Sequence, residues 1–332
     1  MIDAPAKPAR DAHPKYERVL AMAQAQPAIK VAVVHPCDDV SLQSAVEAAR
    51  LRLIEPILVG PAPRIQGLAK ALGFNIEGME IVTSEHSHDS AAKAVELVRA
   101  GRAEALMKGS LHTDEVMEAV VSRDSGIRTA RRITHCFIMD VPGRPEALII
   151  TDAAVNISPT LSDKVDIVQN AIDLAHALRI SDVRVAILSA TETVNAKVPS
   201  TVEAAALCKM AERGQITGAL LDGPLALDNA VSPDAAAIKG IVSPVAGRAN
   251  VLVVPDLEAG NLLAKSLSFL AKADAAGIVL GARVPIIVTS RADSLLTRLA
   301  SCAVAVMLAA ARRSQVSSAI KWKNNTVGND DR

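Results

Sequence analysis

The residues best suited to chemistry lie at the end of an apolar run near residue 290. Ser290 and Arg291 follow the β-branched run 284–289 and precede a Leu/Ala-rich segment that reaches about Ala311. This order predicts a strand, a tight turn and a helix, which would place both side chains beside a helix N-terminus. The free backbone N–H groups there attract anions. Because a guanidinium adds a planar fork of donors, the pair predicts a site for phosphate or for a developing oxyanion.

Asp293 stands two residues after Arg291, and two roles are open for it. It is a general base, or it is a first-turn or N-cap acid that stabilises the following helix by ~0.5–2 kcal/mol. We expect the neighbouring arginine to keep this carboxylate ionised with a low pKa, which would make it a weak base.

Further polar loops follow other predicted strands. Ligands of parallel α/β sheets bind beyond the carboxyl ends of the strands, so we expect these loops to converge on one cleft. A lone polar residue at a strand end is more often a turn former or a helix cap, and that explanation stands beside each assignment. The predicted substrate-binding residues in these loops are Lys108, Ser110, His112, Asp152, Asn156, Asp256 and Asn261.

The elements that would position these residues alternate between strand-like and helix-like patterns. A first helix is expected over 14–26, and Asp39 and Thr113 are expected to cap later helices. A hairpin-like pair of strands flanks Pro142-Gly143. Such alternation predicts parallel sheets with helices on both faces. The predicted strands cover 31–34, 56–59, 79–83, 105–107, 134–139, 147–151, 183–188, 218–221, 250–254 and the run that ends at Ser290.

Composition excludes several classes of partner. The 332 residues carry a formal net charge of zero and only 2% aromatic residues, so binding of nucleic acid is not expected. We see no signal peptide and no apolar run of the ~18–20 residues that a membrane span needs. The four cysteines are far apart in sequence, which favours reduced thiols in a cytoplasmic protein.

Metal and dinucleotide sites are not favoured either. The histidines are scattered, and no cysteine pair has zinc-ligand spacing. The residues after the first predicted strand, 35–39, are His-Pro-Cys-Asp-Asp, where a dinucleotide fingerprint needs glycines. We therefore expect no metal and no bound cofactor.

Taken together, the loops resemble one known family. The stretch Ser243–Asn261, with the sequence SPVAGRANVLVVPDLEAGN, closely resembles the signature of the phosphate acetyl/butyryl transferases. Supporting motifs are Lys108–Thr113, Asp152–Thr160, Asp222-Gly223-Pro224 with Asp228, and Thr289–Ser294. The resemblance covers about residues 15 to 315.

This resemblance implies a fold and a domain division. The implied fold is α/β, with two doubly wound, mainly parallel-sheet domains around an interdomain cleft, like isocitrate and isopropylmalate dehydrogenases. It implies a first domain of about 15–145 plus 300–320 and a second of about 146–299. The ends, 1–14 and 321–332, are expected to be flexible.

The resemblance also implies an activity, the reversible transfer of an acyl group, most simply acetyl, between coenzyme A and inorganic phosphate. The partners would be acetyl-CoA or CoA, phosphate and acyl phosphate, in a homodimer, with coenzyme A as a substrate and no cofactor. The family pattern makes Ser290 and Arg291 active-site residues. Acetyl-transferring members place a carboxylate six residues after the arginine as the proposed base, whereas this chain has Thr297. The Ser-Arg-Ala-Asp-Ser sequence is more similar to the butyryl-transferring branch.

Three alternatives remain open. The first is a phosphate butyryltransferase. The second is a metal-dependent hydroxy-acid dehydrogenase of the same architecture, which would need clustered aspartates for a divalent ion. The third is a non-catalytic sensor of coenzyme A or acyl phosphate. Release of free thiol from acetyl-CoA that depends on added phosphate would support the transferase alone.

Overall fold

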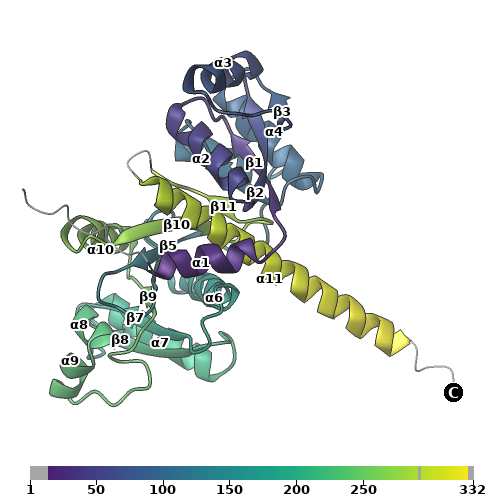
Figure 1. Cartoon of the computed structure of the whole chain (residues 1–332). Coiled ribbons are helices and arrows are strands. Elements are labelled where there is room, and N and C mark those ends of the chain that lie inside the picture. Colours follow the sequence, from purple (N-terminus) through teal and green to yellow (C-terminus); the bar gives the residue numbers. More distant parts are fainter. Residues whose placement is uncertain (1–13, 291–292, 328–332) are drawn as a thin grey trace, which may run out of the picture.

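The computed structural model describes residues 14–290 and 293–327, with side chains as far as Ser314. Within this part of the chain one eleven-stranded sheet runs through the whole molecule in the order β3-β2-β1-β4-β11-β10-β5-β6-β9-β7-β8. Helices cover both of its faces, and the pale green and yellow elements β10, β11 and α11 lie between the upper and lower parts (Figure 1). The predicted α/β class with helices on both faces is confirmed.

The strands fall into two parallel sets joined by antiparallel strands. Pairing is parallel within the first set and within the second set, and antiparallel from β11 through β10 and β5 to β6. The first set is β1 (Ile29–Val34), β2 (Ile54–Gly60), β3 (Glu80–Thr83), β4 (Ala105–Lys108) and β11 (Ile286–Ile287). The others are β5 (Thr134–Asp140), β6 (Leu148–Thr151), β7 (Arg184–Leu188), β8 (Leu220–Leu225), β9 (Val251–Val253) and β10 (Asp274–Leu280).

One face of the sheet carries a continuous apolar layer. Val31 and Val33 of β1 pack on this face in a core built with α1, α2, α3, α6, α7 and α11. The bounds of these helices are α1 (Pro14–Gln24), α2 (Asp39–Arg50), α3 (Ala62–Leu72), α6 (Leu161–Ala177), α7 (Pro199–Glu212) and α11 (Leu295–Val327). The segment 299–309 of α11 is buried in this layer. One helix therefore ties the two parallel sets together.

The opposite face carries two separate cores. Ala32 and Val34 pack with α4 (Ser87–Arg99) and α5 (Thr113–Val121) over the first set. Over the second set lie α8 (Leu227–Val231), α9 (Pro233–Ile238) and α10 (Leu257–Leu270). Because β-strand side chains alternate between faces, one strand feeds both layers. The central strands β5 and β10 lie between the two cores, which leaves room for a cleft on this face.

The structure contains two elements that the sequence did not predict, and it corrects one expectation. The strand β10 and the helix α8 were not predicted. The predicted hairpin around Pro142-Gly143 is confirmed, because β5 and β6 pair in antiparallel orientation. The expectation of no membrane-length run is wrong by length and composition, because Leu295–Ser314 has a mean hydropathy of 1.6. That window is 72% buried inside the protein, as expected for a central core helix.

The predicted domain boundary at 145 falls between β5 and β6, two strands that pair directly. The sheet is continuous across this point. The division into 15–145 plus 300–320 and 146–299 stays a prediction.

Candidate active site

A cleft of about 870 Å³ opens over the central strands, on the face that carries α5 and α10. His135 and Phe137 of β5 and Ala275 of β10 form its floor. Lys265 and Phe269 on α10 line one wall, and the opposite wall holds the end of β4 and the turn between β11 and α11. The cleft therefore takes residues from both parallel sets.

Ser290 and Asp293 form the turn that enters the cleft, as the sequence predicts. Asp293 Oδ2 accepts a hydrogen bond from the Ser290 backbone N–H at 2.6 Å, and the Asp293 N–H donates to the Ser290 carbonyl at 3.2 Å. The turn is thus closed by its own side chain. Arg291, the third predicted catalytic residue, lies outside the described residues.

The electrostatics of Asp293 differ from the expectation. Burial raises the pKa of its carboxyl above the usual range, although the Ser290 N–H and the charge of Arg298 pull it down, and Asp274 adds to the rise. The N-cap alternative is also wrong, because Ser294 Oγ accepts the Thr297 N–H at 3.1 Å and so caps α11. Asp293 is therefore an acid that closes the turn and does not cap the helix.

Behind this turn lies a second carboxylate that the sequence reading missed. Asp274 opens β10 and lines the cleft. Its Oδ1 accepts a hydrogen bond from Thr297 Oγ1 at 3.2 Å. Thr297 is itself buried, and Ser294 Oγ lies 3.1 Å from its hydroxyl. The threonine that stands six residues after Arg291 therefore holds an aspartate from the neighbouring strand.

Two predicted binding residues also reach the cleft. Lys108 lines it from the end of β4, and it also lines a narrow space beside Ser290 and Arg298. Asn261 lines it from α10, and its amide donates to the Ala153 carbonyl at 3.3 Å. A lysine and a carboxamide in one cleft can bind phosphoryl and amide oxygens.

Asp152 and Asn156 lie together behind the cleft floor and are buried. Asp152 accepts hydrogen bonds from the N–H groups of His135, Ala154 and Val155 and, at 2.5 Å, from the Asn156 amide. Asn156 also accepts from Arg132 Nε at 2.6 Å. This network uses both carboxylate oxygens of Asp152 to fix the loop after β6.

Ser110 and His112 face a different cavity of about 550 Å³, at the carboxyl ends of β1 and β4. Ser110 Oγ donates to the His35 carbonyl at 2.9 Å, and His112 is the N-cap of α5. Asp256 caps α10 by accepting the Ala259 N–H at 2.8 Å. The capping explanation therefore holds for the Asp256 side chain, whereas His112 occupies the N-cap position and donates its backbone N–H to Glu115.

Two aromatic residues of the floor were missed because nothing in the local pattern distinguishes them from core. The rings of His135 and Phe137 meet edge to face, with centroids 4.4 Å apart. Burial lowers the pKa of His135 to about 4, so its imidazole is neutral near pH 7. Its Nδ1 is buried without a hydrogen-bond partner among the described residues.

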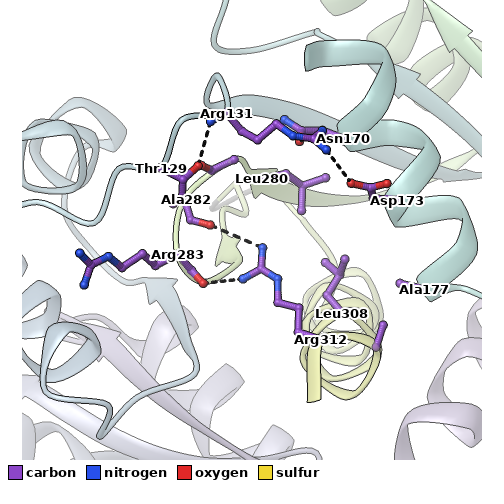
Figure 2. Close-up of a pocket in the computed structure, with 12 residues that line it drawn as sticks. Thr129, Arg131, Asn170, Asp173, Ala177, Leu280, Ala282, Arg283, Leu308 and Arg312 are labelled. Atoms are coloured by element: carbon purple, nitrogen blue, oxygen red, sulfur yellow. Dashed lines mark hydrogen bonds and ion pairs between the residues drawn. The ribbon is translucent and has the colours of Figure 1, made fainter. Parts of the chain in front are cut away.

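A further cavity of about 370 Å³ lies on the opposite face, between α6, α11 and the turn after β10 (Figure 2). Two of its arginine side chains have partners within the cavity. Arg131 lies 3.6 Å from Asp173, and Arg312 donates to the Arg283 carbonyl at 2.6 Å. No predicted site residue lines it.

Thiol and metal chemistry find little support in the described part of the chain. Burial raises the pKa of Cys136, Cys208 and Cys302 to about 12, so these thiols stay protonated near neutral pH. The described residues contain no group of three or more His, Cys, Asp or Glu side chains that could hold a metal ion. Absence of a metal requirement stays a prediction.

Several known proteins are similar to this chain in sequence. Residues 83–306 match the family model described as phosphate acetyl/butaryl transferase. A phosphate acetyltransferase of Rhizobium meliloti is 61% identical, over 92% of this chain and 97% of the relative. A phosphate butyryltransferase of Clostridium beijerinckii is 39% identical, over 89% of this chain and 98% of the relative.

A solved structure shares the fold. The branched-chain phosphotransacylase of Enterococcus faecalis V583 superposes with a TM-score of 0.73 at 28% identity, over 85% of this chain and 99% of that chain. The matched family region contains β4, β5, α10, β10 and the turn at Ser290, which line the cleft. This chain belongs to the phosphate acetyl/butyryl transferase family.

Proposed function

We propose that this chain is a phosphate acetyltransferase, which moves an acetyl group between coenzyme A and inorganic phosphate and forms acetyl phosphate. The observation that carries the proposal is the 61% identity to a phosphate acetyltransferase over 92% of the chain, against 39% to a butyryltransferase. The wide cleft with Lys108, Ser290 and Asn261 supports it, because these donors suit a phosphorylated substrate.

In this proposal the turn at Ser290 handles the charge of the reaction. Arg291 holds the phosphoryl group and stabilises the oxyanion that forms when the acyl carbonyl is attacked. The Ser290 hydroxyl donates to the same oxygen or to phosphate. Lys108 and Asn261 bind the phosphate-bearing and amide parts of the substrates. We further propose a cytoplasmic homodimer that needs no metal and no cofactor.

A phosphate butyryltransferase remains the second candidate, because Asp293 and the Ser-Arg-Ala-Asp-Ser sequence resemble that branch. The floor made by Phe137 and Ala275 is apolar enough for a longer acyl chain.

The test compares kcat/KM for acetyl-, propionyl- and butyryl-CoA at fixed phosphate. We expect acetyl-CoA to be the best substrate, with a modest loss per added carbon, because a pocket discriminates by only ~1–3 kcal/mol per methylene. A higher kcat/KM for butyryl-CoA would replace the proposal with the second candidate. Thiol release that does not depend on phosphate would overturn both.

A further inference from the structure

We propose that Asp274 is the general base of this site and that the Thr297 hydroxyl positions it. The inference rests on the proposed acyl transfer and adds a residue to it. Coenzyme A reacts as a thiolate, and a thiol of pKa ~8.5 is mostly protonated near pH 7, so a proton acceptor in the cleft accelerates attack.

The Asp274 carboxylate accepts a hydrogen bond from a buried side chain and also lines the open cleft. Asp274 lines the cleft with Ser290 and Asp293. The Thr297 hydroxyl donates to Oδ1 at 3.2 Å, and Thr297 is only 3% exposed. Ser294 caps α11 and places its own Oγ 3.1 Å from the Thr297 hydroxyl. A hydrogen-bonded relay from the helix N-terminus thus fixes the orientation of the carboxylate.

Asp293 is the competing carboxylate, and its contacts assign it another task. Its Oδ2 takes the Ser290 N–H at 2.6 Å, and its backbone carbonyl accepts from the Arg298 guanidinium at 2.5 Å. Loss of this carboxylate would open the turn that carries Ser290. Asp293 therefore acts as a positioning residue, whereas the Thr297 hydroxyl holds the Asp274 carboxylate.

Among the described residues, four further elements contribute titratable groups near Asp274. Asp140 stands opposite it on β5 and is paired with Lys15 of α1 at 2.5 Å. Tyr16 of α1 is engaged with the Ile138 carbonyl and the Ala276 N–H, and burial, with Asp274, Asp140 and Asp293, raises its pKa well above the usual range. Lys108 and Lys265 line the cleft. His135, with a pKa of about 4, is a poor proton acceptor near pH 7.

The thiol proton of coenzyme A moves to the Asp274 carboxylate as the sulfur bonds to the carbonyl carbon of acetyl phosphate. The resulting tetrahedral oxyanion collapses, the bond between the carbonyl carbon and the bridging oxygen breaks, and phosphate leaves with that oxygen and the electron pair. The proton on Asp274 passes to the departing phosphate or to water. In reverse, the protonated Asp274 gives its proton to the departing thiolate.

The experiment measures kcat/KM against pH for the whole protein and four variants. In Asp274→Asn we expect kcat/KM to fall ~10²–10³-fold and the acidic limb of the profile to disappear. In Thr297→Val the carboxylate remains but is not held, so kcat falls about 10-fold at unchanged KM, with the limb retained. The double variant Asp274→Asn/Thr297→Asp moves the carboxylate from position 274 to its hydrogen-bond partner at position 297. The two side-chain oxygens are 3.2 Å apart in the wild type, so this variant should regain the acidic limb of the pH profile. Asp173→Asn, in the cavity on the opposite face, is the matched control and should match the wild type.

Two results would overturn the proposal. One is an Asp274→Asn variant that melts cooperatively, retains the acidic limb and loses less than 10-fold in kcat/KM. If that variant does not fold, Thr297→Val decides, and a kcat equal to that of the wild type refutes the assignment. Neither result touches the proposed function, because phosphate-dependent thiol release by the wild-type protein is measured first.

Discussion

At the scale of single residues, the charge state of each acid follows from its contacts more than from its sequence neighbours. The sequence places Asp293 beside an arginine and so predicts a low pKa, but the fold buries the carboxyl near Asp274 and raises its pKa. Asp152 lies at a strand end like Asp256, yet one is buried in a network and the other caps a helix. The sequence alone identifies these aspartates as polar residues at strand ends. Their roles depend on tertiary neighbours that the sequence does not reveal.

The raised pKa of Asp293 predicts a pH-dependent stability. An acid whose pKa is higher in the folded than in the unfolded protein stabilises the fold below its unfolded pKa of ~3.9 and loses this contribution as pH rises through the folded pKa. Asp293→Asn removes the buried charge but keeps an oxygen that can accept the Ser290 N–H. We expect the variant to melt at a higher temperature than the wild type at pH 7, with the difference vanishing near pH 3.5. A variant less stable than the wild type at pH 7 would contradict the pKa assignment.

Arg291 is proposed to stabilise charge in the transition state, so its replacement should affect turnover rather than folding. We expect Arg291→Gln to lower kcat by ~10²–10³-fold with an unchanged melting temperature. Arg291→Lys should recover only part of the loss, because it keeps the charge but loses the bidentate fork. Steady-state kinetics of both variants with acetyl-CoA and phosphate measure this, and near-normal turnover by the Gln variant removes the role.

At the scale of elements, apolar β-branched runs were predicted well and Ala/Gly-rich strands were not. The β-branched strands β1 and β7 appear where their Val and Ile residues indicate. In contrast, β10 has the sequence DAAGIVL, and its Ala and Gly residues have low strand propensity. It forms a strand because β5 and β11 pair with it on both sides. This tertiary effect also hid Asp274, the first residue of β10.

Two N-cap positions were predicted one residue late, whereas the start of α1 at Pro14 was predicted correctly. Asp38 caps α2, where Asp39 was expected, and His112 caps α5, where Thr113 was expected. Two adjacent residues able to cap are hard to separate by type alone, because the choice depends on the backbone path of the preceding loop.

The loop after β6 should depend on the Asp152 network. In Asp152→Asn an amide NH₂ replaces one carboxylate oxygen and then faces N–H donors, because both Asp152 oxygens accept hydrogen bonds from N–H groups. We expect a loss of ~1–3 kcal/mol in the free energy of unfolding. Asp256→Asn is the control and should cost almost nothing, because Asn caps helices as well as Asp. Urea denaturation of both variants tests this, and equal stabilities would contradict it.

At the scale of the whole molecule, the sheet brings together loops that are far apart in sequence. The alternation of strands and helices predicts the layers, and the cleft does contain the predicted Lys108, Asn261, Ser290 and Asp293. The hairpin signal predicts β5 and β6, but nothing in the sequence predicts β10, and these central antiparallel strands turn two parallel sets into one sheet. Their position determines the floor of the cleft, and for that reason His135, Phe137 and Asp274 could not be identified from the sequence.

Metal independence is a property of the whole site and is tested on the intact protein. The proposed steps use a guanidinium, hydroxyl groups and a carboxylate, so we expect dialysis against a strong chelator to leave kcat within the error of the untreated enzyme. Loss of activity that zinc or magnesium restores would show that the reaction requires a metal ion.

The central claim is acyl transfer between coenzyme A and phosphate, and the stoichiometry of one reaction tests it most directly. The purified protein is incubated with acetyl phosphate and coenzyme A, and thioester formed and phosphate released are measured together. The account predicts one acetyl-CoA for each phosphate, and the same final ratio when the reaction starts from acetyl-CoA and phosphate. Phosphate release without thioester, or no reaction in either direction, would contradict it.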